Sequence, residues 1–292
     1  MKRRGVGRTP GLTARMACAI GLLALTYAAL WFGVFELFNL VPAAWPYWVA
    51  IAIALAVALG LHYRNAASSL LATTGAQLVE PGTEPALETM VQRLAALADV
   101  PVPQLALADT EAANAFALGF SQRKAVVVVT TGLRERLRGP ELEAVVAHEI
   151  AHIANRDAAV LTAVAGPRIL GQVLVGEAGE RLGLVWLLIW PLGIPLYAIG
   201  TLLTLPVSRY REFVADRGSA LLTGAPERLM SALAKLSGQA SEIPHDDLRA
   251  ANAFCIVSTE AVRFSLFADH PPLEQRLAAL SELAREMGKP VS

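Results

Sequence analysis

The segment H-E-x-x-H, which begins at His148 and ends at His152, constrains this chain more than any other. In a helix, residues four apart project from the same face, so two imidazoles at this spacing can share one metal ion. Zinc takes such ligands at about 2.0–2.1 Å. Glu149 lies about 100° round the helix from His148, where it can act as general base on a water without ligating the metal. The pattern indicates the chemistry of a zinc hydrolase; the alternative is a surface helix that happens to carry these residues.

A third metal ligand is expected downstream, at Glu212. A catalytic zinc takes three protein ligands and keeps a further position open for water. The segment R-E-F-V-A-D places Glu212 and Asp216 four residues apart, on one face of a predicted helix. Glu212 would complete the set with His148 and His152, and Asp216 could accept the second ring N–H of a ligand histidine. Without H-E-x-x-H upstream, ordinary charge pairing along a helix would be the preferred interpretation of this segment.

The composition indicates membrane spans in addition to a soluble core. The chain is 54% hydrophobic and 17% charged, with no net charge, whereas soluble domains average about 25% charged residues. The uncharged run 17–35 is long enough to cross a bilayer, which takes about 20 residues, and a second apolar run covers 47–61. Aromatic residues at the end of the first run favour an uncleaved span over a signal peptide. Basic flanks at 1–15 and from His62 onward predict a cytoplasmic location for both.

Two further apolar runs, 158–175 and 184–207, separate the H-E-x-x-H motif from Glu212. If Glu212 joins the metal site, the chain between them must cross the membrane an even number of times. Either both runs span, or neither does, and the Pro/Gly-rich centre of the second run then forms a re-entrant hairpin. The basic residues that follow the second run favour two spans.

The rest of the pattern predicts a mostly α integral membrane protein with a small antiparallel β-sheet. Strands are expected at 104–108, 114–118 and 125–130. A helix begins at Pro85, and Gly139 opens the metal-site helix, which is expected to run on past His152 into the next apolar run. The predicted segments are a basic cytoplasmic N-terminus (1–15), a transmembrane hairpin of two helices (16–62), the first catalytic part (63–157), transmembrane helices 3 and 4 (158–207), and the second catalytic part (208–292).

Several motifs occur together in a fixed order across nearly the whole chain. They are N-A-F-A-L at 114–118, V-V-T-T-G-L near 128–133, H-E-I-A-H-I-A-N-R-D at 148–157, R-E-F-x-A-D at 211–216, A-F-C-I at 253–256 and H-P-P-L-x-x-R at 270–276. In this order and spacing the chain resembles the HtpX-type membrane zinc endopeptidases, which are related to the CAAX prenyl endopeptidases. The resemblance implies a gluzincin-like metalloprotease domain with one Zn²⁺ per chain.

The resemblance also implies roles that spacing does not show. Asn114 would lie beside the cleft, near an edge strand that a substrate peptide joins by β-augmentation. His270 and Arg276 would face the active site and hold substrate or stabilise the oxyanion. Membership implies ATP-independent quality control of misfolded membrane proteins under stress, at the bacterial inner membrane, with a cytoplasmic active site and in cooperation with other membrane proteases. Expected partners are polypeptide substrates and the lipid bilayer, with no nucleotide and no nucleic acid.

Two other functions compete with this interpretation. A narrow processing protease, acting on one prenylated or signal-bearing substrate, would need the same catalytic residues, so the motifs do not separate it from quality control. A non-catalytic membrane scaffold with a structural metal is less favoured, because a structural site needs no base such as Glu149 and usually closes with a fourth protein ligand.

Overall fold

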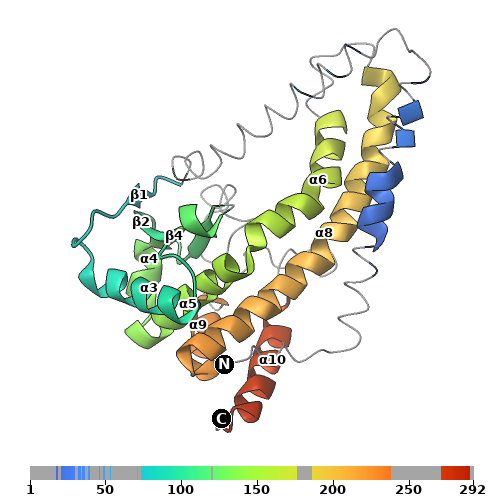
Figure 1. Ribbon diagram of the computed structural model, residues 1–292. Coiled ribbons are helices and arrows are strands. Elements are labelled where there is room, and N and C mark those ends of the chain that lie inside the picture. Colours follow the sequence, from blue (N-terminus) through green and yellow to red (C-terminus); the bar gives the residue numbers. More distant parts are fainter. Residues whose placement is uncertain are drawn as a thin grey trace. The chain divides into compact units, whose positions relative to one another are not determined.

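The computed structural model describes residues 74–119, 121–175, 186–237 and 271–289, together with scattered residues between 18 and 71 (Figure 1). The described residues fall into two compact units. Those within Ala67–Val160 and Ser208–Ser292 belong to the first unit, and those within Gly7–Ala66 and Leu161–Val207 belong to the second. The first unit holds the H-E-x-x-H motif and Glu212, so the candidate site can be built within it.

A four-stranded sheet in the order β1-β2-β4-β3 frames the first unit. The strands are β1 (Gln77–Leu78), β2 (Gln104–Ala108), β3 (Ala115–Leu118) and β4 (Val126–Thr130). β4 runs parallel to β2 and antiparallel to β3, and β1 is antiparallel to β2. The sheet is therefore mixed, and the prediction of an antiparallel sheet is corrected. The physical reason is that β4 lies between β2 and β3 instead of beyond β3, so that β2 and β4, which point the same way, become neighbours.

Strand β4 is buried on both faces, which explains its unbroken run of valines. Val127 and Val129 face the main core, whereas Val126 and Val128 join a smaller cluster with Phe116 on the opposite face of the sheet. β3, in contrast, lies at the edge of the sheet. The edge strand β3 thus lies directly beside a strand that is buried on both faces.

Helices supply the rest of the main core on one face of the sheet. They are α3 (Pro85–Leu97), α4 (Thr131–Arg136), α5 (Gly139–Asn155), α9 (Pro226–Ser237) and α10 (Leu273–Glu286). In α3, Leu87, Val91 and Leu94 recur at helical spacing and are buried. α5 packs against β3, α3 and α9, and α10 packs against α9. The H-E-x-x-H helix is therefore held between the sheet and other helices, with most of its residues buried.

α5 ends at a break that the sequence analysis did not anticipate. Arg156 has a φ of 57° and a ψ of 41°, in the left-handed region, and α6 (Asp157–Val175) starts at the next residue. The expectation that the metal-site helix continues through this point is wrong. A single left-handed residue ends the hydrogen-bonding pattern of α5 and redirects the chain, and that turn brings Asp157 back toward the end of α5.

The second unit contains most of α6 and the first part of α8 (Trp186–Thr223). The two helices approach closely at glycines: a Cβ at Gly200 would lie 2.1 Å from the backbone nitrogen of Arg168, and one at Gly171 would lie 2.3 Å from that of Tyr197. In the part of the chain that the structure describes, we find no helix with both the length and the apolar character that crossing a membrane requires. The predicted N-terminal spans lie largely outside the described residues, and the five-part division of the chain stays a prediction.

Candidate metal centre

Helix α5 brings three potential metal-site side chains together: His148, Glu149 and His152. The Nε2 atoms of the two histidines lie 3.0 Å apart, and the rings are nearly perpendicular, with an interplanar angle of 87°. His148 is 1% exposed and Glu149 is 4% exposed. Two imidazole nitrogens aimed at one point in a buried site are the arrangement that the i,i+4 spacing predicts.

Glu212, on α8, completes a triangle with the two histidines. Its Oε2 atom lies 3.6 Å from His148 Nε2, and its Oε1 atom lies 3.5 Å from His152 Nε2. Three tetrahedral ligands, each about 2.0–2.1 Å from a zinc ion, lie about 3.3 Å from one another. The observed separations, 3.0 Å between the two Nε2 atoms and 3.5 and 3.6 Å from these atoms to the two oxygens of Glu212, are close to that value and fit a single zinc ion. Two nitrogens with one carboxylate are a donor set typical of catalytic zinc.

Close packing of α8 on α5 places Glu212 at this distance. Ser219 donates a 2.6 Å hydrogen bond from its hydroxyl to the carbonyl of Ala144. One residue earlier, Gly218 faces Ala151, and a Cβ at Gly218 would lie 2.5 Å from the Cβ of Ala151. The missing side chain at Gly218 thus sets the separation of the two helices that carry the site.

Replacing Gly218 with alanine is expected to lower the free energy of unfolding by about 1–3 kcal/mol. Carbon atoms in contact prefer about 3.5–4.0 Å, so the added Cβ must push α8 away from α5, and zinc affinity should fall as well. Thermal unfolding and zinc content of the purified protein measure both effects. Gly139→Ala serves as the control, because a Cβ there meets nothing within 4 Å. Wild-type stability and zinc content in Gly218→Ala would contradict the packing argument.

A carboxylate lies beside the second ring nitrogen of His148. Asp216 Oδ1 is 3.1 Å from His148 Nδ1. Arg276, on α10, holds Asp216 with two hydrogen bonds, of 2.8 Å from Nε and 2.6 Å from Nη2, and its Nη1 lies 3.6 Å from Glu212. Arg276 is 2% exposed. Burial disfavours the charged forms of Asp216 and Arg276, but their attraction outweighs it, so the pKa of Asp216 is lowered and the pKa of Arg276 is raised.

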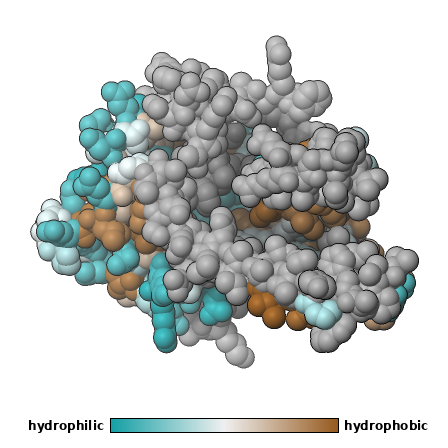
Figure 2. Space-filling view, turned by 90° about the horizontal axis from the view of Figure 1, so that it is seen from above, coloured by the Kyte–Doolittle hydropathy of each residue, from teal (hydrophilic) through white to brown (hydrophobic). Residues whose placement is uncertain are grey.

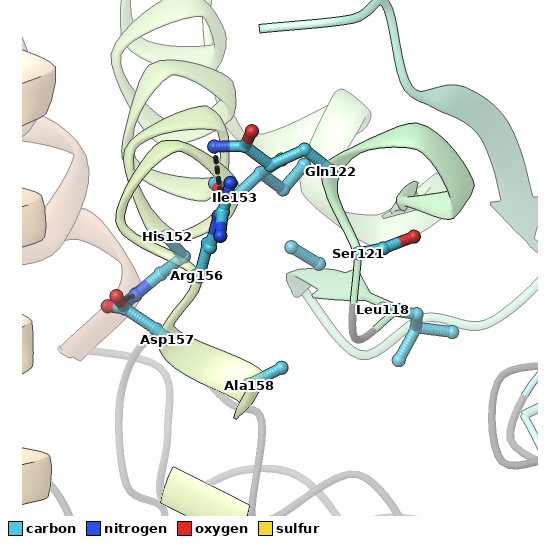
Figure 3. Close-up of a pocket in the computed structure, with 10 residues that line it drawn as sticks. Leu118, Ser121, Gln122, His152, Ile153, Arg156, Asp157 and Ala158 are labelled. Carbon is cyan, nitrogen blue, oxygen red and sulfur yellow. Dashed lines mark hydrogen bonds and ion pairs between the residues drawn. The ribbon is translucent and has the colours of Figure 1, made fainter. Parts of the chain in front are cut away.

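The sequence analysis missed a second carboxylate, Asp157. Its Oδ2 lies 2.7 Å from His152 Nδ1, and Figure 3 shows the two side chains pointing toward each other across the end of α5. Arg211, on α8, forms an ion pair with Asp157. The signal in the sequence was the aspartate five residues after His152, but its meaning depends on the left-handed turn at Arg156.

The backbone N–H of Ala117, in edge strand β3, donates a hydrogen bond to the Glu149 carboxylate. Burial raises the pKa of Glu149, although the nearby histidines and this hydrogen bond oppose the rise. A carboxylate with a raised pKa accepts and returns a proton more readily near neutral pH. Glu149 therefore has the environment of a general base rather than of a surface acid.

The two histidines have opposite proton affinities. Burial disfavours the charged form of His148, but Asp216 and Glu212 outweigh it and raise the pKa of His148 to about 9. Burial and the neighbouring His148 lower the pKa of His152. Zinc ligation requires both rings to have a free nitrogen, so a metal ion at this centre would take the place of the proton on His148.

The remaining predicted site residues fall in different places. Asn114 is buried just before β3, where its backbone accepts hydrogen bonds from the N–H and hydroxyl of Thr130 and returns one to that hydroxyl. Arg276 lies behind Asp216 and Glu212, and its predicted contact with substrate or oxyanion stays a prediction. His270 lies outside the described residues.

Comparison with known proteins adds independent information. The model of peptidase family M48 matches residues 81–284. The chain is 40% identical over 301 aligned positions to "Protease HtpX homolog 2" of Methanosarcina acetivorans, and the alignment covers 98% of this chain and 100% of that protein. It is 41% identical over 307 positions to "Protease HtpX homolog" of Moorella thermoacetica, with 98% of each chain covered. Among solved structures, S. mikatae Ste24p is similar with a TM-score of 0.55 and 18% identity, over 91% of this chain and 67% of that one; at that identity the likeness shows the fold alone.

Proposed function

This chain belongs to peptidase family M48 as an HtpX-type protease, and on that premise we propose that it is a membrane zinc endopeptidase that degrades misfolded or damaged membrane proteins. The observation that carries the proposal is the triangle of His148, His152 and Glu212 with Glu149 on the same helix. A structural zinc site has no use for an additional buried carboxylate beside its ligands. The arrangement supports a hydrolytic site.

The catalytic step is divided among a few side chains. When bound, zinc supplies Lewis-acid chemistry, which makes a water more acidic and polarises the scissile carbonyl. Glu149 accepts the proton of the attacking water and then donates it to the leaving amine, so that it works first as general base and then as general acid. Asp216 keeps the ring of His148 in one orientation. β3 is an edge strand of the sheet, the position at which an extended peptide can add by β-augmentation, which fits an enzyme that cleaves unfolded chains.

Exposed apolar side chains support the membrane part of the proposal. Most of the large apolar side chains that are exposed among the described residues belong to the second unit; examples are Phe32, Phe35, Ile169, Ile194 and Leu202. Figure 2 shows apolar surface in brown and polar surface in teal. Burial of this surface in lipid removes its contact with water. The basic N-terminal flanks support a cytoplasmic active site at the plasma membrane.

Cleavage of an unfolded substrate by the purified, detergent-solubilised protein tests the proposed activity. We expect the protein to cut casein at internal peptide bonds, which mass spectrometry of the products identifies, and to leave a tightly folded soluble protein intact. An extended strand can join β3, whereas a folded chain cannot. Release of single terminal residues, or no cleavage of casein, would overturn the assignment as an endopeptidase.

Two rival functions predict different results in cells. The test compares membrane-protein fragments in cells that carry the wild-type protein with those in cells that carry Glu149→Gln. Quality control predicts many substrates, enriched in damaged proteins, that accumulate uncut with the variant. One sharply cut substrate would indicate a narrow processing protease, and identical fragment patterns would indicate a scaffold without catalysis.

A further inference from the structure

We infer that Asp157 and Arg211 form a positioning pair for the metal ligand His152, separate from the Asp216–Arg276 pair that serves His148. The inference rests on the proposed zinc site and adds two residues to it. The main observation behind the inference is a series of two contacts. The Nδ1 atom of His152 lies 2.7 Å from Oδ2 of Asp157, and Asp157 forms an ion pair with Arg211.

Asp157 is a buried carboxylate whose position is fixed by its ion pair with Arg211. Its side chain is 4% exposed and that of Arg211 is 13% exposed. Solvent-exposed ion pairs contribute little and hold no fixed geometry, but a buried carboxylate clamped by an arginine stays in place. Asp157 can therefore accept the Nδ1–H of His152 and leave Nε2, the atom nearest Glu212, free for the metal.

Arg211 connects this carboxylate to both halves of the site. Besides pairing with Asp157, it donates a 2.8 Å hydrogen bond from Nη2 to the carbonyl of Asn155, the last residue of α5. It thus spans the left-handed break at Arg156 and holds the two sides of that turn. Arg211 also directly precedes Glu212 on α8. The orientation of His152 and the position of Glu212 are consequently coupled through one side chain.

A purely structural alternative exists, because a negatively charged side chain at the start of α6 also stabilises that helix through its dipole. In that role Asp157 would affect the stability of the turn but not the metal. Metal affinity and the ligand-field spectrum of bound Co²⁺ separate the two roles, because both depend on how His152 is presented and neither depends on helix stability as such.

Zinc affinity of the full-length protein in detergent, measured by competition with a chromophoric chelator, tests the inference. All variants carry Glu149→Gln, which prevents self-cleavage. Asp157→Asn keeps the size of the side chain and should weaken zinc binding about 10- to 100-fold, the usual effect of losing a ligand's orienting partner. Arg211→Gln should weaken it in the same direction, and the double variant should be no weaker than Asp157→Asn alone, because the two act as a unit. The Co²⁺ spectrum should shift in both single variants.

Arg217→Gln is the matched control. Arg217 lies on the same helix and pairs with Glu286 at 3.4 Å, away from the metal ligands, so zinc affinity and the Co²⁺ spectrum should not change. Arg211→Lys provides a milder variant, which keeps the charge but loses the planar fork and should show a smaller loss. Wild-type zinc affinity in Asp157→Asn, or losses in the two single variants that simply add, would overturn the inference. Absence of zinc binding in the parent protein would instead refute the proposed function.

Discussion

Replacing Glu149 with glutamine is expected to lower kcat/KM for casein by about 10²–10⁴-fold, which is the range that general acid–base catalysis contributes. Glutamine has nearly the size of glutamate and can still accept the N–H of Ala117, but its amide accepts no proton from water at neutral pH. The loss should appear in kcat, with zinc content unchanged. Measured cleavage rates and metal analysis of the same preparation separate the two effects.

Glu143→Gln is the control for this experiment. Glu143 lies on the same helix and pairs with Arg93 and Arg228 at the surface, so its neutralisation should leave cleavage unchanged. Cleavage at the wild-type rate by Glu149→Gln would show that another group moves the proton, and the mechanism would have to be abandoned.

Replacing Glu212 with alanine is expected to remove most of the zinc. A carboxylate that orients a ligand is worth about 10–100-fold in metal affinity, and a direct ligand should be worth more. The change also leaves Arg276, which lies 3.6 Å from Glu212 and is buried, with one acidic neighbour fewer, so some loss of stability should accompany it. Zinc per chain after dialysis, together with thermal unfolding, provides the measurement.

The exposed Glu227, in the first turn of α9, is the matched control, and Glu227→Ala should retain its zinc. If Glu212→Ala keeps zinc at the wild-type level and affinity, Glu212 is not a ligand. The geometric triangle would then be a coincidence of packing.

Local spacing made part of this structure predictable. The i,i+4 rule relates His148 to His152 and Glu212 to Asp216 within single helices, and the structure has helices α5 and α8 at those positions. Predicting that the two pairs lie together required metal-site chemistry in addition to the helical spacing, because a catalytic zinc requires a third protein ligand. The distances among the three side chains are what that requirement implies.

Features that depend on one backbone angle or on distant residues were not predictable. The role of Asp157 requires the left-handed conformation of Arg156, which residue type alone does not dictate. The pairing of Arg276 with Asp216 joins residues 60 positions apart. The parallel pairing of β2 and β4 follows from which side of β4 the intervening strand takes, and the periodicity of the strands carries no information about that.

Titration of the metal-stripped protein with zinc tests the central claim most directly. The purified protein is freed of metal with a chelator, and casein cleavage is measured as zinc is added back. We predict that the stripped protein is inactive and that activity returns in proportion to zinc, reaching a plateau at one ion bound per chain. Undiminished cleavage by the stripped protein would contradict the assignment of His148, His152 and Glu212 to a catalytic zinc site.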